Sequence, residues 1–255
     1  MTIEEEKIFC LEFENNTLKN SYLKGETERW VFGNSQYATE KEHLERYYFA
    51  SNFVKNKTVL DLSCGAGYGS FLLADMGKAK KVIGCDIDAE AVKYGNLKYK
   101  HPNVDRVVAD VTTFNANEPV DVVVSFETIE HITTYQAFID HVTKILKPGG
   151  LFIVSTPIVI QSRTNCPNPY HLQEWSIKDF HSLIRKNLTV QDTYLQSVTY
   201  IDHFLLLKRI INRFLPNKLK FKTLPDIDYA LTNISAFKST AAINSGYQIV
   251  IGIKS

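Results

Sequence analysis

The sequence has few cysteines, no long apolar run and almost no net charge. Its cysteines are too widely spaced for a zinc ribbon or a disulfide framework, since no CxxC pair occurs among Cys10, Cys64, Cys85 and Cys166. No segment is apolar for long enough to span a bilayer, and the acidic start, Met1 to Lys7, does not resemble a signal peptide. A formal net charge of +1 gives no overall field that would attract nucleic acid. These absences favour a globular cytoplasmic protein whose partners are not nucleic acids.

Short apolar runs alternate with longer amphipathic stretches from about Lys57 onward. The apolar runs predict strands, which are residues 58–62, 81–86, 104–109, 120–126, 151–155, 189–198 and 247–253. Helices are expected between them, at residues 71–76, 89–99, 135–146 and after an N-cap at Ser176. Strands that alternate with helices favour parallel pairing. We therefore predict an α/β fold with a doubly wound, mainly parallel seven-stranded sheet.

Two regions lie outside this alternation. Residues 1–56 are expected to form an N-terminal helical cap, with a helix over 40–52, and residues 57–255 to form the main domain. An insertion of about 202–245, expected to be helical, precedes the last strand. Within it, residues 204–222 are typical of a basic amphipathic helix, which can contact an anionic membrane surface. A lid or a homodimer contact is the alternative, so peripheral attachment to the inner membrane surface and dimerisation both stay open.

A glycine-rich turn follows the first predicted strand, with the sequence Asp-Leu-Ser-Cys-Gly-Ala-Gly-Tyr-Gly at residues 61–69. Glycines allow a backbone to approach a ligand closely. The spacing is not the GxGxxG of a dinucleotide site, and no Lys-Ser/Thr pair follows as in a P-loop. Asp86 ends the second predicted strand, about 20 residues beyond the glycines, where a carboxylate can accept both hydroxyls of a ribose. The pattern predicts a nucleoside site and disfavours a dehydrogenase.

Four segments together resemble the motifs of class I S-adenosylmethionine-dependent methyltransferases. They are residues 59–67, residues 82–86, Asp110 and the Leu-Lys-Pro-Gly-Gly-Leu turn of residues 146–151. The resemblance implies that S-adenosylmethionine is the cofactor. It assigns the methionine end to the glycine-rich turn, the ribose to Asp86 and the adenine to the residues that follow the second and third strands. The implied cofactor residues are Asp61, Ser63, Gly65, Gly67, Asp86, Ile87, Asp110, Val111 and Phe126; Ser63 stands where many relatives have glycine.

The segment after the fourth predicted strand is rich in metal-ligand residue types. Glu127 and Glu130 are three residues apart, and Glu127 and His131 are four apart, so all three side chains would share one side of a helix. Carboxylates with imidazole suit a divalent ion such as Mg²⁺, Mn²⁺, Fe²⁺ or Zn²⁺. His171 is a candidate fourth ligand.

The ExxEH pattern with a later histidine resembles a metal-dependent branch of the same superfamily. That branch includes the ubiquinone-biosynthesis O-methyltransferases and the 2′-O-methyltransferases of small-RNA 3′ ends. The resemblance implies a metal site at Glu127, Glu130, His131 and His171, with Glu127, His131 and His171 acting in catalysis. Many other methyltransferases carry Glu-His at this place without a metal. In that case His131 or His171 becomes the candidate general base.

The segment of residues 28–47 resembles the cap of bacterial methyltransferases associated with glycan and polysaccharide biosynthesis. The resemblance implies that Arg46 pairs with the cofactor carboxylate, and that Tyr37 or His43 lines the pocket. The leading prediction is therefore a metal-assisted O-methyltransferase of a vicinal diol, such as a sugar of a glycan or glycolipid. The alternatives are a metal-independent O- or N-methyltransferase of a small metabolite and a non-catalytic cofactor-binding subunit. An RNA substrate is disfavoured by the near-zero net charge.

Overall fold

The computed structural model describes residues 1–20, 31, 37–200, 234–236 and 243–255. One mixed sheet forms its centre, with the strands in the order β3-β2-β1-β4-β5-β8-β6-β7. The strands are β1 Thr58–Leu62, β2 Lys81–Asp86, β3 Val104–Val108, β4 Val120–Phe126, β5 Leu146–Ile158, β6 Thr189–Tyr200, β7 Ser235–Ala236 and β8 Ile243–Ile253. The predicted bounds of β1, β2 and β4 agree with the structure, because each of these strands is a short apolar run in the middle of the sheet.

Pairing is parallel from β3 to β5, whereas β8 lies antiparallel between β5 and β6. The α/β class and the mainly parallel sheet of the prediction are confirmed. Beyond the seven predicted strands, the two-residue strand β7 pairs with β6 at the edge of the sheet. The strand order reverses at β1, which lies between β2 and β4. In open α/β sheets, ligands bind beyond the carboxyl ends of the strands at such a point.

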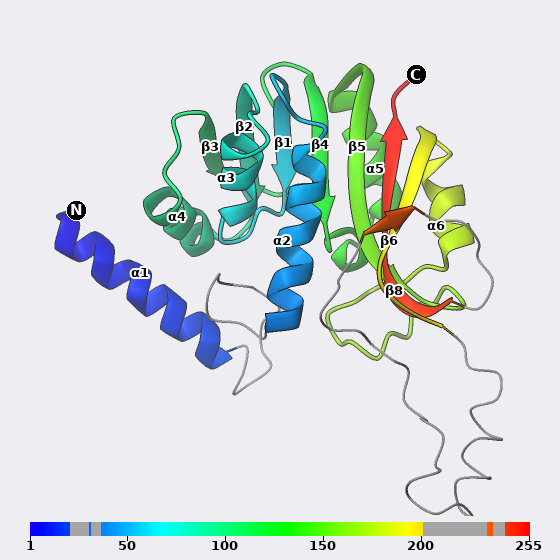
Figure 1. The fold of residues 1–255 in the computed structure, drawn as a ribbon, viewed down its shortest axis with the longest axis horizontal. Coiled ribbons are helices and arrows are strands. Elements are labelled where there is room, and N and C mark those ends of the chain that lie inside the picture. Colours follow the sequence, from blue (N-terminus) through cyan, green and yellow to red (C-terminus); the bar gives the residue numbers. More distant parts are fainter. Residues whose placement is uncertain (21–30, 32–36, 201–233, 237–242) are drawn as a thin grey trace, which may run out of the picture.

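Helices cover both faces of the sheet (Figure 1). They are α1 Ile3–Leu18, α2 Tyr37–Ser51, α3 Tyr68–Asp75, α4 Ala89–Lys98, α5 Tyr135–Ile145 and α6 Ile177–Ile184. Ser176 is the N-cap of α6, as predicted, and its side chain accepts a hydrogen bond from the backbone N–H of Asp179. α2 and α3 bury residues against one face of the sheet, and α5 and α6 do so against the other. The result is a three-layer arrangement.

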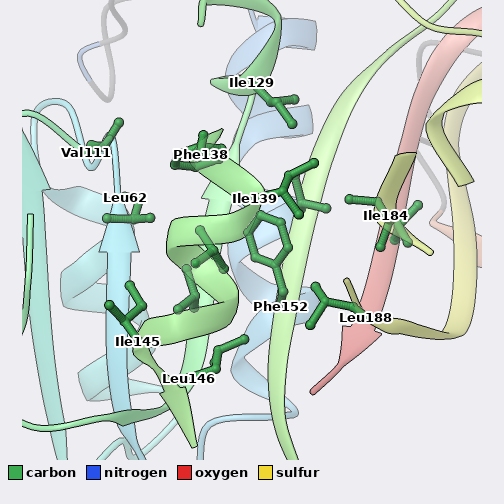
Figure 2. Close-up of a cluster of buried hydrophobic side chains, with 14 of the residues drawn as sticks. Leu62, Val111, Ile129, Phe138, Ile139, Ile145, Leu146, Phe152, Ile184 and Leu188 are labelled. Carbon is green, nitrogen blue, oxygen red and sulfur yellow. The ribbon is translucent and has the colours of Figure 1, made fainter. Parts of the chain in front are cut away.

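The larger core lies between the sheet and α5 (Figure 2). Phe138 and Ile139 of α5 are fully buried against Phe152 of β5, and the Phe138 and Phe152 rings meet edge to face at 6.3 Å. The amphipathic pattern of α5 explains this packing, since its buried positions recur at helical spacing on one side of the helix. The core therefore holds β4 and β5 rigidly, and with them the segment that follows β4.

The N-terminal region contains a helix, α1, whose bounds the sequence pattern does not predict. α1 packs on α4 through stacked rings of Phe13 and Tyr94, whose centroids are 4.5 Å apart, and the Tyr94 hydroxyl donates to Glu14. The predicted helix of residues 40–52 corresponds to α2. The basic segment 204–222 and most of the predicted insertion lie outside the described residues. Among the helices that the structure describes, none has the length and apolar character needed to cross a membrane.

Candidate active site

A cavity of about 370 Å³ opens at the carboxyl ends of the central strands. Its walls come from the glycine-rich turn, from α2, from the ends of β2 and β4, and from the loop after β5. The lining includes Ser63, Gly65, Asp86, Phe126, Glu127, Glu130, His131, Asn168, His171 and Tyr247. The cavity therefore joins the predicted nucleoside residues to the predicted metal ligands in one continuous space.

The glycine-rich turn adopts left-handed backbone conformations at alternate residues. φ is +61° at Ser63, +53° at Gly65 and +84° at Gly67. At Gly67 a Cβ atom would lie 2.4 Å from Nε of Arg106, so no larger residue fits there without displacing that side chain. Arg106 is buried beneath the turn and donates from Nη2 to the carbonyl of Gly67 at 2.8 Å. The sequence pattern identifies the turn but gives no indication of this supporting arginine.

Asp86 lies at the rim of the cavity and supports the turn. Its two carboxylate oxygens accept hydrogen bonds from the backbone N–H groups of Gly65 at 2.8 Å and Asp88 at 3.0 Å. Each carboxylate oxygen has a further lone pair that can accept from a ribose hydroxyl. Ile87 is 73% exposed next to it, whereas Val111, beyond β3, is buried. An exposed isoleucine beside a ribose-type carboxylate is suited to lie against a purine ring.

Asp110 is the other predicted residue at the adenine edge, and its carboxylate is engaged locally. It accepts from the hydroxyl and the backbone N–H of Thr112 at 2.7 and 2.8 Å. These hydrogen bonds lower the pKa of the Asp110 carboxyl. The residue is exposed. It therefore caps the chain after β3 and stays charged at the surface.

Asp61 lies behind the turn and is not part of the cavity lining. The hydroxyls of Tyr47 and Ser70 donate to its two oxygens at 3.1 and 2.6 Å, which ties α2 and α3 to β1. Burial raises the pKa of Asp61 to about 6, even though both hydrogen bonds lower it. In the described geometry Asp61 acts on the cavity through Tyr47, whose ring is part of the lining.

Arg46 of α2 is fully buried, between two cavity-lining residues of the same helix, His43 and Tyr47. Its Nη1 donates to Oε1 of Gln196 at 2.7 Å, and its guanidinium lies 4.7 Å from the centre of the Tyr247 ring. Nε and Nη2 have no hydrogen-bond partner among the residues that the structure describes. The side chain of Tyr37, the other residue predicted to line the pocket, is outside the described part of the chain.

Three of the four predicted metal ligands come together. Glu130, His131 and His171 each place a ligand atom within 4.8 Å of those of the other two. Glu130 and His131 belong to a single 3₁₀ turn, Ile129–His131, and His171 comes from the loop after β5. Glu127 lines the same cavity but is not in this group.

The expectation that Glu127, Glu130 and His131 share one helix face is wrong. Glu127 precedes the 3₁₀ turn and has a left-handed backbone conformation, with φ of +49°. Its carboxylate accepts from the Ser155 hydroxyl at 2.6 Å. Three or four residues of separation bring side chains together only on a continuous helix, and the chain is not helical at Glu127.

Both histidines use Nδ1 as a donor, so Nε2 carries the lone pair; at His171 that lone pair accepts from Nδ2 of Asn168 at 3.0 Å. Nδ1 of His131 lies 2.9 Å from the carbonyl of Tyr170, and because a carbonyl only accepts, Nδ1 bears the proton. Nδ1 of His171 likewise donates to Oε1 of Glu174 at 2.7 Å. Histidines that bind metal ions are usually held in this way by a carboxylate or a carbonyl.

Glu174 is itself held by Arg163. Its other oxygen, Oε2, accepts from Nε and Nη2 of Arg163 at 2.7 and 2.6 Å. The same two residues exchange backbone hydrogen bonds, each 2.9 Å long, and so close the base of the loop that carries His171. The sequence shows Glu174 only as a neighbour of His171, and Arg163 has no sequence signal.

Glu130 is fully buried, and one of its two carboxylate oxygens accepts a hydrogen bond. Oε2 accepts from the hydroxyl of Thr156 at 3.2 Å, whereas Oε1 has no hydrogen-bond partner within the described ranges. Burial, followed by the negative charge of Glu127, raises the pKa of Glu130 well above 4.5. A buried carboxylate oxygen without a donor, next to two imidazole lone pairs, has the chemistry of a divalent-cation site.

Comparison with known proteins agrees with this geometry. A family model described as a methyltransferase domain matches residues 53–201. A probable S-adenosylmethionine-dependent methyltransferase of Mycolicibacterium smegmatis is 34% identical over 160 residues, which cover 60% of each chain. The ubiquinone biosynthesis O-methyltransferase of Paramagnetospirillum magneticum is 35% identical over 122 residues, covering 44% of this chain and 48% of the relative. The chain thus matches between about half and 60% of the length of these sequence relatives.

Solved structures agree on the fold. The N-methyltransferase NodS from Bradyrhizobium japonicum, in complex with S-adenosyl-L-homocysteine, aligns over 96% of this chain and 98% of its own, with a TM-score of 0.56 at 12% identity. The strand order and the glycine-rich turn followed by Asp86 define a class I S-adenosylmethionine-dependent methyltransferase. Since the family model covers more than half of the sequence, this chain belongs to the methyltransferase domain family.

Proposed function

We propose that this chain is an O-methyltransferase that uses S-adenosylmethionine and acts, with metal assistance, on a hydroxyl of a vicinal diol. The observation that carries the proposal is the group Glu130, His131 and His171 in the same cavity as Asp86. One cavity that offers a nucleoside carboxylate and a cation-binding set can hold a methyl donor beside a chelated acceptor.

Each cofactor residue has a proposed place around the cofactor. Arg46 would hold the methionine carboxylate, which supplies acceptors for its two unpartnered nitrogens. Asp86 would accept from the ribose hydroxyls, and Ser63, Gly65 and Gly67 would pass close to the cofactor at the turn. Ile87, Asp110 and Val111 would surround the adenine. Phe126 would form the cavity wall at the end of β4, and Asp61 would act by fixing Tyr47.

The donor set fits a divalent ion such as Mg²⁺, Mn²⁺, Fe²⁺ or Zn²⁺. Glu130 would use its unpartnered Oε1, and each histidine its Nε2, with Glu127 as a further ligand across the cavity. When bound, such an ion supplies positive charge that lowers the pKa of an acceptor hydroxyl. The chain itself keeps both imidazoles in the ligating tautomer through Tyr170 and Glu174.

A vicinal diol suits this arrangement because two adjacent oxygens can chelate one ion. The similarity to a ubiquinone biosynthesis O-methyltransferase supports an oxygen acceptor. A sugar of a glycan or glycolipid is the acceptor we favour. The proposed cap role of α2, the membrane contact of residues 204–222 and a homodimer are further parts of this hypothesis.

The proposal is tested by methyl transfer from radiolabelled S-adenosylmethionine to paired acceptors. A catechol or a cis-diol sugar should be methylated, whereas the matching monohydroxy compound should react far more slowly. Removal of metal with a chelator should abolish transfer, and added Mn²⁺ or Mg²⁺ should restore it. Full activity after complete metal removal would exclude the metal part of the proposal.

The alternative is a metal-independent O- or N-methyltransferase of a small metabolite. The hydrogen-bonded series Arg163, Glu174 and His171 favours it, because it keeps the proton on Nδ1 and leaves Nε2 of His171, which here accepts from Asn168, as the basic nitrogen. This alternative predicts that Glu127→Ala has little effect, while His131→Ala or His171→Ala abolishes transfer with or without added metal.

A further inference from the structure

Arg46 is a buried cation on which the charges of Glu42 and Glu130 act, but it forms no direct ion pair with a described residue. It is completely inaccessible to solvent, and no carboxylate of the described residues forms an ion pair with it. Of its three nitrogens, only Nη1 has a hydrogen-bond partner in the described part of the chain, and that partner is the neutral amide of Gln196. An unpaired buried charge is strongly unfavourable. The arrangement therefore calls for an anionic ligand at Nε and Nη2.

Gln196, on β6, forms hydrogen bonds both with the guanidinium of Arg46 and with two further groups of α2. Oε1 of Gln196 accepts from Arg46, while Nε2 donates to the carbonyl of Glu42 at 3.0 Å and to Oε2 of Glu45 at 3.1 Å. Because Nε2 already has two acceptors on α2, the amide is oriented with its oxygen toward Arg46. A single side chain thus sets the position of Arg46 relative to both α2 and the sheet.

The backbone around Gln196 is irregular, and this irregularity brings the Gln196 side chain close to Arg46. Gln196 lies opposite Tyr247 on β8, and the register of the two strands then shifts before Thr199. Gly246 has φ of +137°, and a Cβ on it would lie 2.9 Å from the carbonyl oxygen of Gln196. Glycine at 246 therefore permits the close approach of β6. Neighbouring residues of paired strands share a face, so Tyr247 places its ring under the guanidinium next to Gln196.

We propose that Gln196 is a positioning residue for the cofactor, which directs Nε and Nη2 of Arg46 at the methionine carboxylate. The inference rests on the proposed role of Arg46. Three cavity-lining residues, His43, Tyr47 and Tyr247, adjoin Arg46 in sequence or in space. Arg46 is not itself part of the lining and would meet the carboxylate where these residues border it. Gln196, also outside the lining, would act only through Arg46.

The test compares two ligands in isothermal titration calorimetry of the whole chain. S-adenosylhomocysteine carries the amino-acid carboxylate, and 5′-methylthioadenosine keeps the nucleoside but lacks that group. Gln196→Leu should weaken binding of S-adenosylhomocysteine about tenfold, since hydrogen bonds to charged groups are the stronger ones. Binding of 5′-methylthioadenosine should be unchanged. In turnover, KM for S-adenosylmethionine should rise by a similar factor at nearly constant kcat.

Gln248→Leu is the matched control. Gln248 is equally buried on the neighbouring strand β8, but it follows Tyr247 and so faces the other side of the sheet. Neither its amide nitrogen nor its amide oxygen has a hydrogen-bond partner among the described residues. This variant should bind both ligands as the wild type does. If Gln196→Leu does not fold, Gln196→Met, which keeps the length of the side chain, takes its place.

The outcomes separate this inference from the proposed function. Equal weakening of both ligands by the Gln196 variant, or of neither, would overturn the inference. Arg46→Met tests the underlying assignment, and an unchanged ratio of the two affinities in that variant would remove Arg46 as the carboxylate site. If Arg46→Met loses the preference for S-adenosylhomocysteine and the Gln196 variant keeps it, only the role of Gln196 is refuted.

Discussion

Replacement of Asp61 by asparagine should change how the stability of the protein depends on pH. Asp61 is buried, and its pKa is raised from 3.8 to about 6. Since one pKa unit corresponds to about 1.4 kcal/mol, keeping this carboxylate ionised in the folded protein costs about 3 kcal/mol at pH 7. Asparagine removes the charge and keeps the shape, and the hydroxyls of Tyr47 and Ser70 can rotate to suit the amide.

The direction of this pH dependence follows from proton uptake on folding. Because the pKa is higher in the folded state, the folded protein binds a proton that the unfolded chain has released between pH 3.8 and about 6. The stability that the protonated carboxyl gives is complete below pH 3.8 and is lost as the pH rises through about 6. The free energy of unfolding of Asp61→Asn, relative to wild type, should therefore increase by about 3 kcal/mol from acid to neutral pH and level off above pH 7.

Urea unfolding at a series of pH values from about 3 to 8, followed by circular dichroism, measures this difference. Asp121→Asn is a control of opposite sign. Its pKa is lowered by hydrogen bonds from Lys147 and from the backbone of Thr58, which outweigh partial burial. That variant should lose stability relative to wild type as the pH rises from 3 to about 5, and the difference should stay constant at higher pH. A pH-independent difference for Asp61→Asn would refute the argument that burial dominates at this carboxyl.

Three further predictions concern the cavity. Gly67→Ala should cost more stability in urea unfolding than Gly149→Ala, because both have positive φ but only at 67 does a Cβ meet Arg106; equal losses would contradict this. Each of the two substitutions also costs about 1–2 kcal/mol, because alanine must adopt a left-handed backbone conformation there. Asp86→Asn should weaken binding of 5′-methylthioadenosine and S-adenosylhomocysteine alike in calorimetry, since both contain the ribose; an effect on only one ligand would argue against ribose contact. Glu174→Gln should lower Mn²⁺ affinity about tenfold or more by freeing His171, and unchanged affinity would exclude its orienting role.

The glycine-rich turn, Asp86 and the strands around them were predictable because each is a local pattern. A buried strand is a run of apolar residues, and a turn that needs positive φ selects glycine. Ser63 departs from that rule and has a φ of +61°, and the structure accommodates it. α1 was missed because only two of its residues, Phe13 and Thr17, are buried, so its apolar pattern is weak.

The ligand set illustrates the limit of such patterns. The spacing of Glu127, Glu130 and His131 predicted a shared helix face, but the left-handed backbone at Glu127 separates it from the other two. His171 was a candidate ligand by its residue type and by the resemblance, and its contact with Glu130 and His131 depends on a loop closed by Arg163 and Glu174. No local pattern in the sequence marks that closure.

By itself the sequence determined the α/β class, the nucleoside turn and the residue types available for chemistry, because these depend on neighbours along the chain. The tertiary structure decided which of those residues meet. It removed Asp61 from the cavity lining, separated Glu127 from the histidine pair and joined Arg46 to Gln196, a residue 150 positions away. Contacts of this kind are set by how helices and strands pack, and packing is a property of the whole fold that no single segment encodes.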